Sequence, residues 1–212
     1  MKFIRNNWYY IGAVLFVCLA YVMVLWGDAM PFNQRLQVLL LMTMLIHQVE
    51  EYVLPGGFPM FWNIASNGEK ERFSYYPLDK RNAAIVNVGA WLAYGAAALL
   101  PDLYVLGIGV AWVGLAQGIV HAIRLNIKAR TFYNPGMATV LLLFYPLGIW
   151  YVCYVANHFE ITALQWILSF VVTFCITFFL LALPMKIFTP KDDRYAWSED
   201  EMKQYKDRLL NK

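Results

Sequence analysis

The chain has 212 residues, of which 60% are hydrophobic and 15% are charged, and its mean hydropathy is +0.48. Soluble domains are about 45 to 50% apolar, so this composition excludes an ordinary soluble domain and favours an integral membrane protein. The formal charge of +3 comes without a basic stretch interleaved with aromatic residues, so we expect the lipid bilayer as a partner and no nucleic acid.

Apolar segments of about 20 residues recur six times along the chain, and each is long enough to cross a hydrocarbon core about 30 Å thick. We therefore predict an all-α fold, a polytopic integral membrane helical bundle with about six transmembrane helices, in one domain of residues 1–190. The first segment is longer than the apolar region of a signal peptide and lacks a small-x-small cleavage site, so we expect it to be retained. The segments run from Trp8 to Trp26, Leu36 to Leu54, Ala83 to Leu100, Leu103 to Ile123, Met137 to Ala156 and Leu164 to Met185.

Lysine and arginine residues collect in the connections on one side of these segments, whereas Arg35 stands alone on the other side. Basic residues favour the cytoplasmic side of a membrane, so both termini should be cytoplasmic. The expected location is the plasma (cytoplasmic) membrane, as a multi-pass protein. The basic residues before the tail are Lys2, Arg5, Lys70, Arg72, Lys80, Arg81, Arg124, Lys128 and Arg130.

Three ionisable residues, His47, Glu50 and Glu51, interrupt the second apolar segment. One charged side chain near the centre of a spanning helix costs about 2.5 to 3.5 kcal/mol on insertion scales, so such groups persist where they pair or bind something. Residues three and four apart share a helix face, which turns His47 toward both glutamates. This cluster is the strongest indication of function in the sequence.

Other polar residues should lie at the same depth in the neighbouring segments. Gln117 and His121 are four apart and share one face of the fourth segment. Asn87 lies one turn into the third segment, and Asn134 opens the fifth as a helix cap. At a rise of 1.5 Å per residue, His47 and His121 should each lie within roughly 10 Å of the cytoplasmic interface. The sequence therefore predicts a polar layer near one side of an otherwise apolar bundle.

The connection after the second segment contains Pro55, Gly56 and Gly57, which should end the helix and turn the chain sharply. The apolar residues that follow, among them Phe58 and Trp62, should lie in the membrane interface as a short cover over the polar layer. Two roles are open for this cover, which are anchoring in the interface and gating of a substrate.

Residues 191–212 carry charges of both signs, and Ser198 precedes Glu201 in capping-box spacing. We predict that this tail is a short charged cytoplasmic surface helix without chemistry of its own. His158 lies in a connection on the opposite side from the other histidines and should not belong to the site. The cysteines have neither zinc-ligand nor disulfide spacing and should pack in the core: Cys18, Cys153 and Cys175.

The H-Q-V-E-E segment of residues 47–51, followed by P-G-G-F at residues 55–58, resembles the polytopic membrane proteins named for an H-x-x-E-E motif. The resemblance extends to His121 and to Y-N-P-G-M-A-T at residues 133–139, and it covers about residues 40–147. It implies a shared fold for this core. It implies no activity, because that family is defined by its motif and not by an established reaction.

A metal site is the first hypothesis for the polar layer. His47 and His121 would supply imidazoles, and Glu50 and Glu51 would supply carboxylates. These ligands suit a divalent metal, either zinc or, with two histidines and one carboxylate, iron or manganese. One glutamate would be a ligand, and the other would be a general base or a partner of a ligand imidazole, so both are candidate catalytic residues. The residues alone leave open which glutamate has which role.

A site at the depth of the interface predicts a membrane enzyme that acts on a lipid or another amphiphilic substrate, by hydrolysis or oxidation. The residues expected to contact the substrate are Asn87, Gln117, Asn134, Phe58 and Trp62.

Two alternatives use the same cluster. A proton-coupled small-molecule transporter or a ligand-binding membrane protein could use the histidines and glutamates as a relay. Alternatively, His47 forms a buried ion pair with Glu50 or Glu51 that only fixes helix packing, while His121 bonds to a backbone carbonyl. Small residues in the third and fourth segments allow close helix contact within one chain or between two, so a homodimer is open as well.

Overall fold

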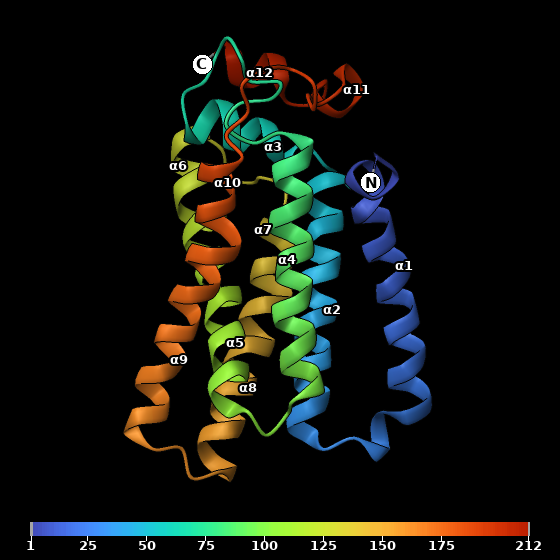
Figure 1. The fold of residues 1–212 in the computed structure, drawn as a ribbon, viewed down its shortest axis with the longest axis vertical. Helices are drawn as coiled ribbons and strands as arrows, with labels where there is room; N and C mark the ends of the chain where they lie inside the picture. Colours follow the sequence, from blue (N-terminus) through green and yellow to red (C-terminus); the bar gives the residue numbers. More distant parts are fainter. Residues whose placement is uncertain (1, 212) are drawn as a thin grey trace.

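The computed structural model describes residues 2–211, and 76% of it is helix, without β-strands among the described residues. This confirms the predicted all-α fold. Figure 1 shows long helices that lie side by side and short helices that lie across one end of the bundle. That end carries α3, α11 and α12 and is called the tail end below.

Three of the long helices contain wider, π-type turns, which divide each of them into shorter labelled pieces. The bundle consists of α1 (Lys2–Trp26) with η1 (Gly27–Ala29), α2 (Phe32–Tyr52), α4 (Lys80–Leu99), α5–η3–α6 (Tyr104–Gly118, Ile119–Leu125, Asn126–Ala129), α7–η4–α8 (Met137–Thr139, Val140–Phe144, Tyr145–His158) and α9–η5–α10 (Ala163–Cys175, Ile176–Ala182, Leu183–Ile187). The short helices at the tail end are α3 (Phe58–Met60), η2 (Phe61–Ser66), α11 (Glu199–Met202) and α12 (Lys206–Leu210).

Five helices are long and apolar enough to cross a membrane, and they match five of the six predicted segments. Several extend further than predicted, because helical hydrogen bonding continues through polar end turns that an apolar pattern leaves out. The first helix, for example, begins at Lys2 and not at Trp8. The five helices run over Lys2–Ala29, Lys80–Leu99, Tyr104–Ala129, Met137–His158 and Ala163–Ile187, and they indicate a multi-pass membrane protein.

The helix that carries the H-x-x-E-E motif, α2, is not among these five because polar residues interrupt its apolar sequence. It has 21 residues, and helices α1, α4 and α8 pack around it. Its apolar side chains Leu36, Leu40 and Leu45 are fully buried, and most of its polar side chains, including His47 and Glu51, are buried as well. Because neighbouring helices enclose α2, these buried polar groups contact other parts of the protein and not the environment outside the bundle.

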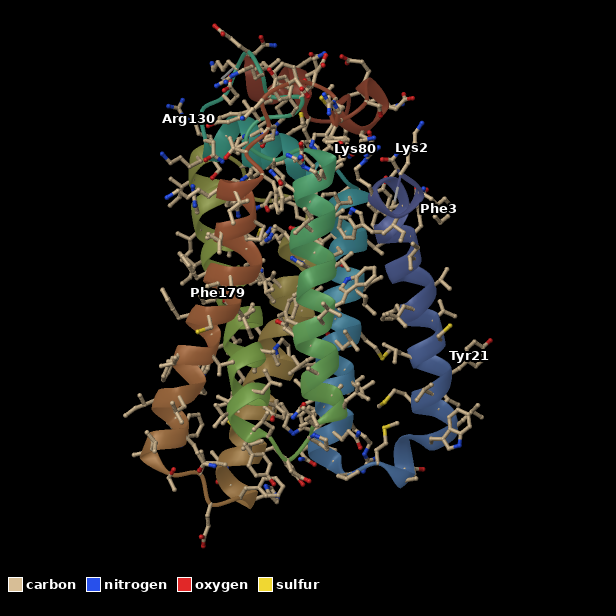
Figure 2. All side chains as sticks on the ribbon, viewed as in Figure 1. Lys2, Phe3, Tyr21, Lys80, Arg130 and Phe179 are labelled. Atoms are coloured by element: carbon tan, nitrogen blue, oxygen red, sulfur yellow. The ribbon has the colours of Figure 1, made fainter. Side chains whose placement is uncertain are left out.

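The outer helices expose apolar side chains, as a surface in contact with lipid requires. Tyr21 on α1 and Phe179 on η5 point away from the bundle (Figure 2), and both are more than half exposed. In the interior, the glycines of α5 allow close packing: a side chain at Gly109 would collide with Val172 of α9, and one at Gly114 would collide with Phe144. The small residues of α5 therefore allow close packing between helices of the same chain.

The C-terminal tail packs on the tail end of the bundle through buried apolar residues. Trp197 donates its indole N–H to the carbonyl of Leu78 at 2.8 Å, and the Tyr205 ring contacts the Phe61 ring with centroids 5.0 Å apart. Lys80, at the start of α4, forms an ion pair of 2.7 Å with Glu201. The capping box expected at Ser198 and Glu201 is present and begins α11, and a second short helix, α12, follows.

Removal of the Glu201 charge should loosen the tail. Burial raises the pKa of Glu201, but hydrogen bonds from Lys80 and Ser198 outweigh it and hold the pKa below its ordinary value. This carboxylate therefore stabilises docking above the ordinary glutamate pKa, and its contribution is lost as the pH falls through the lowered pKa. We expect Glu201→Gln to weaken docking by about 1 kcal/mol, which is roughly a fivefold rise in the released fraction.

Limited proteolysis of the tail in detergent would measure this release. Asp200→Asn is the matched control, since Asp200 pairs with the exposed Lys203 of the same short segment. Equal cleavage rates for Glu201→Gln and the wild type would show that this ion pair does not hold the tail.

Candidate metal centre

Helix α2 directs its two adjacent glutamates to different partners. Successive residues of an α-helix are about 100° apart around the axis, so neighbours cannot share one face. Glu51 lies one turn beyond His47 and faces it, whereas Glu50 faces the start of α7. The structure thus separates two residues that the spacing alone leaves equivalent.

Glu51 brings together the two histidines of the polar layer. Its Oε1 atom lies 3.6 Å from Nε2 of His47 and 3.4 Å from Nε2 of His121, which comes from η3. The three side chains are at most 6% exposed, and one ligand atom from each lies within 4.8 Å of the others. Two imidazoles and one carboxylate therefore converge in the interior of the bundle.

The N···O distances from Glu51 to the two histidines are closer to the distance between two ligands of one metal ion than to the length of a direct hydrogen bond. An N–H···O hydrogen bond has its heavy atoms about 2.9 Å apart. Nitrogen and oxygen ligands that are each about 2.0 to 2.1 Å from a tetrahedral zinc ion lie about 3.3 Å from one another. The 3.4 and 3.6 Å separations from Glu51 to His121 and His47 are close to the second value. The two separations at Glu51 therefore suit ligands of one tetrahedral ion, and the three ligand atoms all lie within 4.8 Å of one another.

His121 is held in one orientation by Asn134. The Asn134 amide nitrogen donates to the His121 carbonyl and to Oδ1 of Asn126, both at 2.7 Å. Its oxygen therefore faces Nδ1 of His121, at 2.8 Å, and accepts a hydrogen bond from it. With the proton on Nδ1, a neutral imidazole presents the Nε2 lone pair toward Glu51, as a metal ligand must.

His47 is oriented in the same way by Thr139. The Thr139 hydroxyl donates to Oε2 of Glu50 at 2.6 Å, so its lone pair is free to accept from Nδ1 of His47 at 2.9 Å. The Nε2 lone pair of His47 then also faces Glu51. Both imidazoles are thus prepared by a hydrogen bond at the nitrogen that is remote from the cluster.

Glu50 binds the first turn of α7, at the start of the spanning helix Met137–His158. Its carboxylate accepts the backbone N–H groups of Ala138 at 3.0 Å and Thr139 at 2.8 Å, in addition to the Thr139 hydroxyl. The Tyr133 hydroxyl donates a further hydrogen bond at 2.8 Å. Burial, followed by this bond to Glu50, raises the pKa of Tyr133 above its ordinary value, which keeps the hydroxyl protonated. Glu50 is therefore saturated with donors and is linked to His47 through the Thr139 hydroxyl.

Gly136 lies directly against both imidazoles. Its φ of +100° is in the left-handed region that favours glycine, and a Cβ atom here would overlap the rings of His121 and His47. The turn that starts α7 can approach the cluster this closely only without a side chain.

A cavity of about 140 Å³ opens beside the cluster, and His47 and Glu51 form part of its wall. Most of its lining is apolar. Four of the five residues expected to contact a substrate line it, namely Asn87, Gln117, Phe58 and Trp62. The fifth, Asn134, does not; it supports His121 instead.

The remaining expectations concern the cysteines and residues that support the cluster. The cysteines do not pack in the core as predicted, because Cys18 and Cys153 are exposed and Cys175 is only partly buried. His158 ends α8 and bonds to the carbonyl of Tyr154, at the end of the bundle opposite the tail end, as predicted. His121 bonds through Nδ1 to a side-chain amide and not to a backbone carbonyl, which corrects that part of the ion-pair alternative. Sequence reasoning missed the supporting roles of Tyr133, Asn126 and Thr139. The first and last belong to the Y-N-P-G-M-A-T segment, which was the available signal.

Comparison with known proteins gives one match. A family model described as a protein of unknown function with HXXEE motif matches residues 38–151, which is more than half of the chain. Neither the curated proteins nor the solved structures contain a significant match. The matched segment contains the complete cluster of His47, Glu51 and His121.

Replacement of Glu50 should destabilise the fold more than replacement of Glu51. Glu50→Gln leaves backbone and hydroxyl donors facing an amide, at a cost of about 2 to 3 kcal/mol for bonds to a charged group. Glu51→Gln removes a buried charge and should cost less than about 1 kcal/mol without metal. Thermal unfolding of the metal-free variants in detergent would compare them. Equal losses of stability would contradict the division of roles.

Gly136→Ala should be strongly destabilising, by about 3 kcal/mol, because strain at positive φ adds to overlap with two rings. Gly68→Ala is a matched control. Gly68 also has a positive φ, of +72°, but its added Cβ would meet nothing within 4 Å. The same unfolding measurement should show about 1 kcal/mol for the control. Similar losses for the two variants would mean that Gly136 does not press on the histidines.

Proposed function

The chain belongs to the family defined by the HXXEE motif, and we propose that it is a membrane-embedded, metal-dependent enzyme that acts on a lipid or another amphiphile. One observation carries this proposal. Nε2 of His47, Nε2 of His121 and a carboxylate oxygen of Glu51 converge at separations suited to one metal ion, beside a largely apolar cavity.

We propose that α2 crosses the membrane as a sixth, central helix. Its length of 21 residues is sufficient, and its neighbours cover its polar side chains. Basic residues support a cytoplasmic tail end: Lys2, Lys80 and Arg130 all lie at that end of the bundle (Figure 2). Both termini would then be cytoplasmic, with the protein in the plasma membrane and the site near its cytoplasmic interface.

We propose zinc as the metal. Octahedral ions such as iron(II) or manganese hold adjacent ligands about 3.0 Å apart, whereas tetrahedral zinc holds them about 3.3 Å apart. The 3.4 and 3.6 Å separations from Glu51 to the histidines are closer to the tetrahedral value. Three protein ligands and one open position are typical of catalytic zinc, so the reaction type that follows is hydrolysis.

When bound, zinc would supply a Lewis acid and lower the pKa of a coordinated water. The chain itself would perform the other tasks. Asn134 and Thr139 hold the ligand imidazoles in the correct orientation, and Glu50 holds Thr139. The amides of Asn87 and Gln117 lie in the cavity wall, where they can hydrogen-bond a polar group of the substrate.

The structure offers less support for a proton-coupled transporter. The core side chains next to the cluster on the side away from the tail end are apolar, and they include Met44, Leu40 and Phe144. Further on, Gln37 and Tyr151 bond to each other at 2.7 Å. A proton path through these residues would have to cross a packed apolar layer, so the enzyme is the better explanation of the cluster.

The metal content of the purified protein tests the proposal. We expect about one zinc per wild-type chain in detergent, and at least roughly tenfold weaker retention after His47→Ala, His121→Ala or Glu51→Gln. His158→Ala is the control and should retain the metal, because His158 lies outside the cluster. Elemental analysis without added metal provides the measurement.

Two results would overturn the assignment. Full metal content in the His47→Ala and His121→Ala variants would place any metal elsewhere. An absence of metal from the wild type, even after dialysis against zinc, would leave the cluster as a structural ion pair or a proton relay.

A further inference from the structure

The cavity beside the cluster runs along the bundle axis and not across it. Its lining starts near the tail end with Phe58 and Trp62 and reaches inward to Met44 on α2 and Ile176 on η5. From Tyr52 to Met44 is eight residues of helix, or about 12 Å. A volume of about 140 Å³ spread over this length is narrow, since a compact cavity of similar volume holds one benzene-sized molecule.

The chemistry of the wall changes along the cavity. At the inner end it is apolar, with Met44, Ala90, Val113 and Ile176 from four different helices. Beyond these residues lie the ligand residues His47 and Glu51, together with the amides of Gln117 and Asn87. The Asn87 amide donates to the Tyr52 hydroxyl at 3.3 Å, whereas the Gln117 amide has no hydrogen-bond partner among residues 2–211. The Gln117 amide, which is partly buried, can therefore hydrogen-bond a ligand within the cavity.

A cation stacks on Trp62, one of the residues that line the cavity near the tail end. The Arg124 guanidinium lies over the Trp62 ring, 5.1 Å from its centroid, and remains exposed. Stacking on an aromatic ring holds the guanidinium in place while leaving its N–H groups free for an anion. An anionic group at this end would lie at the level of a lipid head group if the tail end faces the cytoplasm.

We infer that the cavity binds a single-chain acyl amphiphile with an anionic head group. The acyl chain fills the apolar inner end, the carbonyl at its head accepts from Gln117 beside the metal ligands, and the head group lies at Arg124. The inference rests on the proposed function in naming an acyl ester or amide as the bond presented to the metal site. The small volume of the cavity, about 140 Å³, favours one acyl chain over two.

Photolabelling in detergent tests the inference. The probe is lysophosphatidylglycerol with a diazirine near the end of its acyl chain, and peptide mass spectrometry locates the label. We expect labels on the segments around Met44, Ala90, Val113 and Ile176. Labels confined to outward residues, such as Tyr21 or Phe179, would overturn the inference, and this result does not depend on any variant.

Variants then test each part of the cavity. Ala90→Phe should fill the inner end and reduce labelling about fivefold or more. Leu92→Phe is the control on the same helix, since Leu92 is 71% exposed, and it should label like the wild type. Arg124→Ala should remove a preference for the anionic probe over lysophosphatidylcholine with the same chain. Equal labelling of the wild type by both probes would contradict the role of Arg124.

Two further arms separate the remaining possibilities. Unlabelled single-chain lipid should compete with the probe for the cavity. If a two-chain phosphatidylglycerol reduced labelling at the same concentration, the inference that the cavity takes only one acyl chain would be contradicted. Labelling is also measured on His47→Ala. Retained labelling together with a failed metal test would refute only the proposed function, whereas bound metal without cavity labelling would refute only this inference.

Discussion

The burial of two adjacent carboxylates on α2 is the constraint on which the arrangement of the other helices depends. A buried carboxylate is costly unless it is fully hydrogen-bonded or faces a cation. Glu50 meets this need by accepting hydrogen bonds from Ala138 and Thr139 at the start of the α7–η4–α8 helix, and Glu51, which faces the unprotonated Nε2 atoms of two imidazoles, would meet it with a bound cation. Because the two side chains leave the helix about 100° apart, they connect α2 with α7 and η3, so the cluster and the helix packing form one unit.

The helices were predictable because membrane-spanning helices need continuous apolar length, and this requirement appears directly in the sequence. Helix α2 shows the limit of that signal. Its apolar pattern is interrupted, yet protein surrounds it, and burial by neighbouring helices cannot be read from the helix itself. The π-type turns and the packing of Trp197 and Tyr205 on the tail end also depend on tertiary contacts, which local periodicity does not encode.

The members of the polar layer were largely predictable, but their roles were not. Depth along each helix follows from the rise per residue, so His47, His121, Asn87 and Gln117 could be placed at one level. Rotation about the helix axis depends on what packs there, so the spacing could not distinguish Glu50 from Glu51. Asn134 illustrates the same limit. A polar residue at a helix start can face a substrate or a histidine, and the sequence pattern is the same in both cases.

One part of the cavity wall lies within the segment that matches the family, and the other part lies outside it. The ligands and their hydrogen-bond partners, from His47 to Thr139, all lie within the segment that the family shares. Ile176, Leu181 and Met185, which close the cavity from η5 and α10, lie beyond it. A related protein could therefore keep the same chemical centre and exchange only this last helix. If the proposed enzyme function holds, members of the family could then differ in substrate while they keep the same reaction.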